Sequence, residues 1–143
     1  MEIKPLSAGD RPQLAELLSR IETFSPEEVL CALELIDLAL TGDNKDYQVL
    51  VANRDGKVVG YVCYGPTPMT QGCFDLYWIA SDPLVRGQGV GAALVSAMEG
   101  DIRRRQGRLI RVETSAMEAY GPTRGFYQAM NYKEECRFRD FYK

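Results

Sequence analysis

The sequence predicts a single α/β domain, of the α+β kind, in which helices flank a mixed, mostly antiparallel central sheet. The length of 143 residues suffices for one domain with a buried core. Two segments of helical period come first, and the apolar period becomes strand-like at about residue 47. Farther along, a glycine-rich segment separates a strand-like run from a helix-period run, which is typical of a helix that connects two parallel strands.

The N-terminal segment predicts a short strand and a first helix. Residues 3–6 suit the strand. In the helix, Asp10 is the predicted N-cap and Pro12 lies in the first turn. Its apolar residues at helical spacing are Leu14, Leu17, Leu18 and Ile21.

A second helix begins at a capping box. Ser25 is the N-cap, Pro26 takes the first helical position and Glu28 closes the box. Its predicted apolar face consists of Val29, Leu33, Ile36 and Leu40. Gly42 can end this helix, because glycine tolerates the left-handed conformation of many helix C-termini.

The middle of the chain predicts three strands. Residues 47–52 and 57–64 are β-rich, and the sequence Asn-Arg-Asp-Gly at 53–56 joins them as a hairpin. After a loop with two prolines, residues 73–80 predict the next strand, which leads into the glycine-rich segment.

The remaining residues predict a helix, a strand, a short helix and a last strand. The first of these helices spans about 89–106, with Val90, Leu94, Ala97, Met98 and Ile102 on one side. Residues 108–114 form a strand parallel to 73–80 if this helix is the connection between them. Residues 123–130 predict the short helix and 132–138 the last strand.

Charge and hydropathy limit the partners. The net charge is −3 without a basic block, and we expect the arginine run 103–105 to be a solvated helix face, so no nucleic-acid partner is expected. No apolar run is long enough to span a bilayer, so no membrane partner is expected. The N-terminus shows no signal peptide, and we expect a cytoplasmic protein.

The residue types that are absent exclude several mechanisms. The sequence contains no histidine, which excludes Ser-His-Asp and Cys-His catalysis and zinc sites that use histidine, and no metal is expected. The four cysteines form no C-x-x-C pair, and we expect them to be reduced and mostly buried: Cys31, Cys63, Cys73 and Cys136.

The glycine-rich segment 85–94 carries the strongest functional signal. A strand–loop–helix context presents several backbone N–H groups at a helix N-terminus, where the helix dipole also favours an anion. The glycines at 87, 89 and 91 leave out side chains, so a bulky anion can approach the main chain. The segment therefore predicts a phosphate or pyrophosphate site.

Two motif interpretations compete for this loop. The pattern G-x-G-x-x-A at 87–92, with Glu113 about 20 residues farther on, matches a dinucleotide-binding fingerprint. The pattern R-x-x-G-x-G at 86–91 is similar to the acyl-CoA pyrophosphate loop of the GCN5-related N-acetyltransferases (GNAT family). A dinucleotide fingerprint opens a series of βαβ units, but only residues 107–143 remain after the helix and a hairpin precedes the loop. The position therefore favours the acyl-CoA loop.

The chain resembles the GNAT family along most of its length. The matching segments, in the family's order, are 58–61, 76–80, Asp82-Pro83, 86–91 and 124–132, the last of which resembles the family's F-Y-x-x-x-G-F element. Two positions depart from the family, because Asn131 replaces the usual Gly and Tyr120 stands where many members carry an Asn. The resemblance implies one acyl-CoA N-acyltransferase domain over 1–143, without its final strand, in which one parallel strand pair splays apart.

The resemblance also implies the chemistry. An acetyl group of acetyl-CoA, the cosubstrate, would pass to a primary amine of a small molecule or peptide by direct attack. The pantetheine arm would pair with the main-chain edge at Trp78, Ile79 and Ala80, and an N–H near Ile79 would face the thioester oxygen. The pyrophosphate would be bound at Arg86, Gly87, Gln88, Gly89, Val90, Gly91 and Ala92.

Three residues are candidates for proton transfer. By resemblance, Tyr127 is the general acid that protonates the departing thiolate, since a tyrosine is protonated at neutral pH. Packing on one face of a short helix is its alternative role. Asp75 shares a strand face with Tyr77 and Ile79 by alternation, and Glu113 ends the next strand, so either could be the general base.

Other functions remain open at this stage. They are a non-catalytic acyl-CoA-binding module, a dinucleotide-binding domain and an interaction domain that binds neither ligand. The acceptor is equally open among small metabolite amines, amino acids and peptide N-termini, although carboxylates at Glu22, Asp75 and Glu113 favour a cationic amine. Because residues 139–143 are too few for a turn and a partner strand, the edge of 132–138 is left unpaired, and we expect a homodimer with the C-terminal region at or near its interface.

Overall fold

A computed structural model describes residues 1–139 and 141, and the chain divides into two compact units, an N-terminal unit Met1–Val112 and a C-terminal unit Glu113–Lys143. The N-terminal unit contains β1 (Glu2–Pro5), α1 (Arg11–Ser19), α2 (Pro26–Ala39), β2 (Gln48–Arg54), β3 (Lys57–Pro66), β4 (Cys73–Ser81), α3 (Val90–Arg104) and β5 (Leu109–Val112). The C-terminal unit contains α4 (Gly121–Ala129). Short 3₁₀ turns are η1 (Ala8–Asp10), η2 (Pro83–Val85) and η3 (Glu118–Tyr120).

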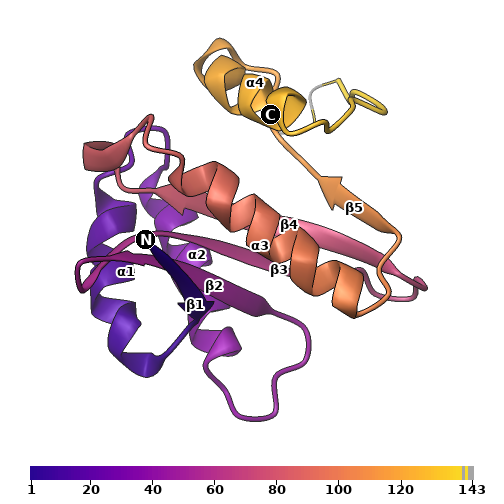
Figure 1. The fold of residues 1–143 in the computed structure, drawn as a ribbon. Helices are drawn as coiled ribbons and strands as arrows, with labels where there is room; N and C mark the ends of the chain where they lie inside the picture. The colour runs from indigo at the N-terminus through magenta and orange to yellow at the C-terminus, as the bar shows by residue number, and fades with distance from the viewer. Residues whose placement is uncertain (140, 142–143) are drawn as a thin grey trace. The chain divides into compact units, whose positions relative to one another are not determined.

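The five strands of the N-terminal unit form one mixed sheet in the order β1-β2-β3-β4-β5. The first three neighbouring pairs are antiparallel, and β4 and β5 are parallel with α3 as their connection. α3 covers one face of the sheet, and α1 and α2 cover the other (Figure 1). This arrangement confirms the predicted fold class.

Each face of the sheet has its own apolar core. On the α1 and α2 face, the fully buried helix residues are Leu14, Leu17, Leu18, Ala32 and Ile36. On the α3 face, the buried helix residues are Val90, Leu94, Val95, Met98 and Ile102. Burial of one such side chain stabilises the fold by about 1.5–3 kcal/mol. The predicted helical periods are confirmed, although Val95 rather than Ala97 completes the α3 core.

The start of α2 confirms its predicted capping box, whereas the other two helix-end predictions hold in part (Asp10) or not at all (Gly42). The Glu28 N–H donates to Ser25 Oγ (3.1 Å), and the Ser25 N–H donates to Glu28 Oε1 (3.0 Å). Asp10 is the N-cap residue of α1 as predicted, but its carboxylate makes no cap hydrogen bond to the helix and accepts from the N–H and the hydroxyl of Ser7 instead. α2 ends with Leu40 as its C-cap in the right-handed region, so Gly42 is not needed as a left-handed cap.

The hairpin between β2 and β3 has the predicted turn. Asp55 and Gly56 both have positive φ, at 52° and 80°. This is the backbone that a two-residue turn needs to match the twist of its strands, and Asp-Gly adopts it readily. The hairpin prediction is therefore confirmed.

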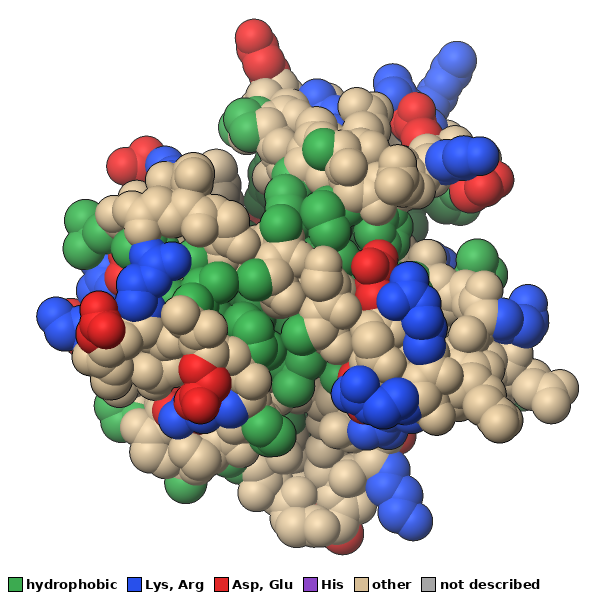
Figure 2. Space-filling model, in the orientation of Figure 1, with side chains coloured by type: hydrophobic (Ala, Val, Ile, Leu, Met, Phe, Trp, Pro, Cys, Tyr) green, Lys and Arg blue, Asp and Glu red, His purple; other side chains and the backbone are tan. Residues whose placement is uncertain are grey.

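The arginine run 103–105 is exposed at the C-terminal end of α3, as predicted. Figure 2 shows Lys and Arg side chains gathered near this end of the helix. Asp101 lies 3.0 Å from Arg105 Nε and 3.5 Å from Arg104 Nη2, and it also accepts a 2.6 Å hydrogen bond from the hydroxyl of Tyr64. The run thus belongs to a solvated ion-pair cluster.

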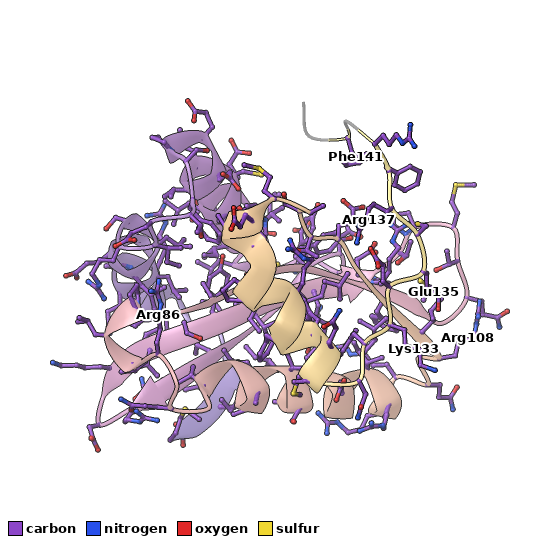
Figure 3. The ribbon with its side chains drawn as sticks, turned by 90° about the horizontal axis from the view of Figure 1, so that it is seen from above. Arg86, Arg108, Lys133, Glu135, Arg137 and Phe141 are labelled. Carbon is purple, nitrogen blue, oxygen red and sulfur yellow. The ribbon has the colours of Figure 1, made fainter. Side chains whose placement is uncertain are left out.

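The strand predicted at 132–138 is wrong, since these residues form no regular element in the described structure. The segment does alternate, with Tyr132, Cys136 and Phe138 on one side, but Glu134 places a charge in the middle of that side and weakens it as a face to bury against a core. Figure 3 shows Lys133, Glu135 and Arg137 along this extended segment. Arg137 instead pairs locally with Glu134 at 2.8 Å.

Candidate functional site

The glycine loop lies between η2 and the N-terminus of α3, as predicted. Gly87 and Gly89 have φ of 78° and 80°, a left-handed backbone that other residues adopt at a cost. Among the described residues, no atom lies within 4 Å of where a Cβ would stand on either glycine. Gly89 is also the N-cap of α3, so no cap side chain covers the N–H groups of the first turn. The loop can therefore receive an anion at its main chain.

Both ends of the loop are held by side chains. At the start, Asp82 Oδ1 accepts the N–H of Leu84 (3.0 Å), so Asp82-Pro83 is a turn element as its sequence suggests. At the other end, Gln88 Oε1 accepts from Arg54 Nη1. Arg86 is exposed beside the loop (Figure 3). Gln88 thus supports the loop through its side chain, and Arg86 is available to an incoming anion.

The parallel pairing of β4 and β5 stops halfway along β4. Its register runs from Cys73↔Leu109 to Leu76↔Val112. Beyond Leu76, β4 continues to Ser81 with β3 on one side and, within the N-terminal unit, no strand on the other. This confirms the expected splayed pair.

The main-chain groups of Ile79 face this open edge. The N–H of Asp82 donates to Val59 on β3 (2.8 Å). Since successive N–H groups of a strand alternate between its two sides, that of Ala80 also faces β3 and that of Ile79 faces away from it. The N–H predicted to meet a thioester oxygen thus lies on the edge that a ligand could reach.

A β-bulge at Tyr77 changes the faces of β4. Cys63 pairs with Trp78 and Tyr64 pairs with Leu76, so Tyr77 is an extra residue. As a result, the consecutive side chains of Tyr77 and Trp78 both pack on the α1 and α2 face. Phe24 stacks edge-on against Trp78 at 5.3 Å, and Tyr47 does so against Tyr77 at 5.4 Å.

The same bulge corrects the predicted position of Asp75. Asp75 pairs with Gly65, and paired residues direct their side chains to the same face of a sheet. A Cβ on Gly65 would point toward Tyr77, so Asp75 and Tyr77 share a face as predicted. Ile79 lies on the opposite face. Its partner Val62 is two residues from Gly60 and shares the face of Gly60, which is directed toward Val90 and Leu94 of α3. Strict alternation fails because the extra residue shifts the period by one.

Asp75 already has a cationic partner. Its carboxylate is 7% exposed and lies opposite Arg111 in the parallel register. Arg111 Nε lies 2.7 Å from Asp75 Oδ1, and Nη2 lies 3.3 Å from Oδ2. Asp75 thus already accepts one hydrogen bond from Arg111 at each oxygen, and the cation beside it stabilises the ionised carboxylate.

Tyr127 and Glu113 belong to the C-terminal unit. Tyr127 lies on α4, 8% exposed, with the rings of Phe126 and Tyr132 packed edge-on at 5.3 and 5.8 Å. Burial raises the pKa of the Tyr127 phenol to about 12. Glu113 follows β5 directly and is exposed. The N-terminal unit thus contains the glycine loop and the open part of the β4 edge, while Asp75 lies toward the other end of β4, beside β5.

Metal sites, membrane-spanning helices and disulfides are the remaining features to consider among the described residues. These residues contain no group of three or more Cys, Asp or Glu that could hold a metal ion. Their helices are too short or too polar to cross a bilayer. All four cysteines are free: Cys63 and Cys73 are buried, and Cys31 and Cys136 are exposed, so the expected burial holds for half of them.

Three arginines of the site were missed by reasoning from the sequence. Arg111 had a usable signal, since it lies in the strand parallel to that of Asp75. Arg54 had a weaker one, its place in the hairpin turn. Arg20 had none, because its partner Asp82 is 62 residues away in sequence.

Comparisons with known proteins agree on one family. A family model described as an acetyltransferase (GNAT) domain matches residues 45–134. A solved structure from Desulfovibrio desulfuricans, described as a GNAT-family protein, is 36% identical with a TM-score of 0.95 over 99% of this chain and 91% of that chain. No curated protein matches this chain.

Two more distant structures share the fold. AAC(6')-Iy, in complex with the bisubstrate analogue CoA-S-monomethyl-acetylneamine, is 17% identical with a TM-score of 0.75 over 99% of this chain and 97% of that chain. The ribosomal-protein-alanine N-acetyltransferase of Brucella melitensis is 20% identical with a TM-score of 0.72 over 96% of each chain. At these identities the likeness concerns the fold alone.

Proposed function

Because the chain belongs to the GNAT family of acetyltransferases, we propose that it transfers an acetyl group from acetyl-CoA to a primary amine of a small molecule or peptide. The observation that carries this proposal is the combination of an open glycine loop with a splayed β4 edge beside it. One feature accepts an anion and the other accepts an extended amide chain, and acetyl-CoA contains both groups.

Main-chain groups supply the binding of acetyl-CoA. The first turn of α3 and the loop before it would hold the pyrophosphate, with Arg86 adding its charge. Of the three residues predicted to meet the pantetheine arm, Ile79 presents its main-chain groups to the open edge and would pair with a pantetheine amide, whereas those of Trp78 and Ala80 face β3. The two left-handed glycines support this, because a Cβ at either would project into space that is now open.

The transfer forms an N–C bond and breaks a C–S bond. The Ile79 N–H would stabilise the charge that develops on the carbonyl oxygen as the amine attacks directly. Tyr127 would donate its proton to the departing sulfur, and its raised pKa keeps that proton in place at neutral pH. The excess proton of the attacking amine passes to a carboxylate, directly or through water.

Asp75 and Glu113 stay the two candidates for that carboxylate. Asp75 lies on the strand that carries Ile79, four residues away, and its pairing with Arg111 favours the ionised form and makes it a weaker base. Glu113 is exposed at the end of β5 and makes a simpler acceptor. Parallel Asp75→Asn and Glu113→Gln variants distinguish them, because only the base should remove the acidic limb of the pH–rate profile.

The acceptor class is proposed only broadly. The two distant neighbours are named for an aminoglycoside-type analogue and for a ribosomal-protein alanine, which are a small amine and a protein N-terminus. Exposed carboxylates at Glu22 and Glu113 favour a cationic amine, while Asp75 is already paired with Arg111. The free cysteines fit a reducing compartment, so we propose the cytoplasm as its location.

Two measurements test the proposal. Calorimetry with acetyl-CoA, CoA and NAD should show binding of the first two and none of NAD. An amine panel read by release of free thiol should then identify an acceptor. Binding without turnover on any amine would favour the acyl-CoA-binding module, NAD binding would favour the dinucleotide domain, and binding of neither ligand would leave an interaction domain.

A further inference from the structure

An ion pair ties the end of α1 to the turn that begins the glycine loop. Arg20 Nη2 lies 2.6 Å from Asp82 Oδ2, and Arg20 Nη1 lies 3.2 Å from Glu16. The other oxygen of Asp82 accepts the Leu84 N–H at 3.0 Å, and the Asp82 carbonyl accepts the Val85 N–H at 2.9 Å. Asp82 thus connects α1 to the first turn of η2.

This contact differs from an ordinary surface ion pair. Asp82 is 7% exposed, and the Nε of Arg20 is buried without a hydrogen-bond partner among the described residues. Burial alone would raise the pKa of Asp82, but the Leu84 N–H and Arg20 outweigh it and hold that pKa below its usual value. A buried carboxylate that loses its cation is costly, so the pair constrains the turn more than an exposed pair does.

Arg20 is itself fixed by the core. It is the C-cap of α1, where its N–H donates to Leu17 and Leu18, and both of these side chains are fully buried. Asp82 is fixed on the other side by its N–H, which donates to Val59 of β3. The turn before the loop is therefore attached to two rigid elements.

From this geometry we propose that Arg20 is a positioning residue for acetyl-CoA binding, which acts through Asp82 to hold the glycine loop in its binding conformation. The inference rests on the proposed function in one respect, the identity of the loop's ligand. Arg20 lies outside the loop and need not touch acetyl-CoA; its effect comes from the order it gives to the N–H groups at 87–90. A loop that is already ordered loses less entropy when its ligand binds.

The test compares two arginines of the same helix. Arg20→Gln removes the anchor of the loop. Arg11→Gln is the matched control, because Arg11 Nε lies 2.8 Å from Asp37 Oδ1 and ties the other end of α1 to α2. Arg20→Gln should raise the Kd of acetyl-CoA about tenfold or more and speed amide exchange at 84, 85 and 88, whose N–H groups are hydrogen-bonded in this turn, whereas Arg11→Gln should change neither.

Further variants separate positioning from general destabilisation. Asp82→Asn, which keeps a cap oxygen for Leu84 but loses the charge, should reproduce the effect, and Arg20→Lys should restore part of the affinity. The KM of the amine should stay unchanged, and urea unfolding should show that all variants are folded. Equal Kd values and equal loop exchange in Arg20→Gln and Arg11→Gln would overturn the proposal. If wild-type protein binds no acetyl-CoA, the proposed function fails, while loop exchange still decides the role of Arg20.

Discussion

The phenolic proton of Tyr127 stays bound far above neutral pH, because burial raises the pKa of this group to about 12. The protonated form is the one that can donate to a thiolate, but a higher pKa also makes the phenol a weaker acid, so the shift itself does not identify an acid role. Packing explains the burial equally well, since Phe126 and Tyr132 enclose the ring. Removal of the hydroxyl with the ring retained distinguishes the two roles.

Tyr127→Phe should lower kcat about 100-fold or more with little change in the Kd of acetyl-CoA. The matched control is Tyr132→Phe, which removes a hydroxyl from the neighbouring ring. Because the donor is lost only as the pH approaches 12, the wild-type kcat should show no alkaline loss from this group at pH 8–10. A wild-type rate for Tyr127→Phe would assign the residue to packing.

At the level of single residues, local backbone requirements could be predicted from the sequence, whereas contacts between distant residues could not. Glycines 87 and 89 were identifiable because the backbone they require is a local property. The pairing of Asp75 with Arg111 joins residues 36 apart and depends on strand order, which only the fold determines. Alternation placed Asp75 beside Tyr77 correctly and beside Ile79 wrongly, because nothing in the local sequence marks the bulge.

At the scale of elements, two glycine-dependent features position the site. One is the loop at the N-terminus of α3, which needs the left-handed conformation at Gly87 and Gly89. The other is the close approach of the β3 end to the segment before β2, where a Cβ at Gly65 would lie 1.8 Å from the carbonyl oxygen of Asp46. Substitution in the loop should mainly weaken ligand binding, whereas substitution of Gly65 should mainly lower the stability of the fold.

Gly89→Val should greatly weaken the binding of acetyl-CoA, because a side chain would fill the open space above the loop. Some loss of stability is expected too, of about 1–2 kcal/mol, from the positive φ of 80°. Gly72→Val is the control, since Gly72 has the same φ but lies just before β4, at the opposite end of that strand. Calorimetry should find near-wild-type affinity in the control, and an unchanged Kd in folded Gly89→Val would refute the pyrophosphate assignment.

Gly65→Ala should destabilise the protein by about 3 kcal/mol or more, because the contact at risk is backbone against backbone. Gly100→Ala serves as its control: there the nearest atom to a Cβ is the flexible end of Arg104, 3.7 Å away. In a helix that change should stabilise by about 1 kcal/mol. Urea unfolding measures both, and similar midpoints for the two variants would show that the Asp46 contact relaxes freely.

Element predictions succeeded where a local signal decides the outcome. The capping box at Ser25, the Asp-Gly turn and the core face of α3 all follow from neighbours along the chain. The strand predicted at 132–138 is wrong, because its apolar alternation is interrupted by Glu134 and a strand also needs a partner strand, which local sequence does not reveal.

At the scale of the whole molecule, the unpaired strand edge no longer supports the predicted homodimer, but an exposed aromatic pair does. The unpaired strand edge that motivated it is absent, since 132–138 forms no strand. The same region, however, exposes two aromatic rings, Phe138 at 70% and Phe141 at 59%, with centroids 5.7 Å apart. Exposed neighbouring aromatics are typical of association surfaces.

We predict a dimer that Phe138→Ser weakens and Leu30→Ser does not. Leu30, on α2, is 64% exposed and provides a control of similar exposure. Light scattering across a concentration series should show a dimer for wild type and Leu30→Ser, and a shift toward monomer for Phe138→Ser. A wild-type protein that stays monomeric at high concentration rules the dimer out.

The early end of the β4–β5 pairing has a consequence for folding thermodynamics. Main-chain donors and acceptors on the outer side of residues 77–81 have no strand partner within the N-terminal unit, and such groups need a hydrogen-bond partner. A bound amide chain would behave as a sixth strand that is supplied from solution. By mass action, such a ligand at 100 times its Kd adds about 2.7 kcal/mol to the stability of the native state. Thermal melting with and without acetyl-CoA therefore measures how much the proposed ligand adds to the stability of this sheet.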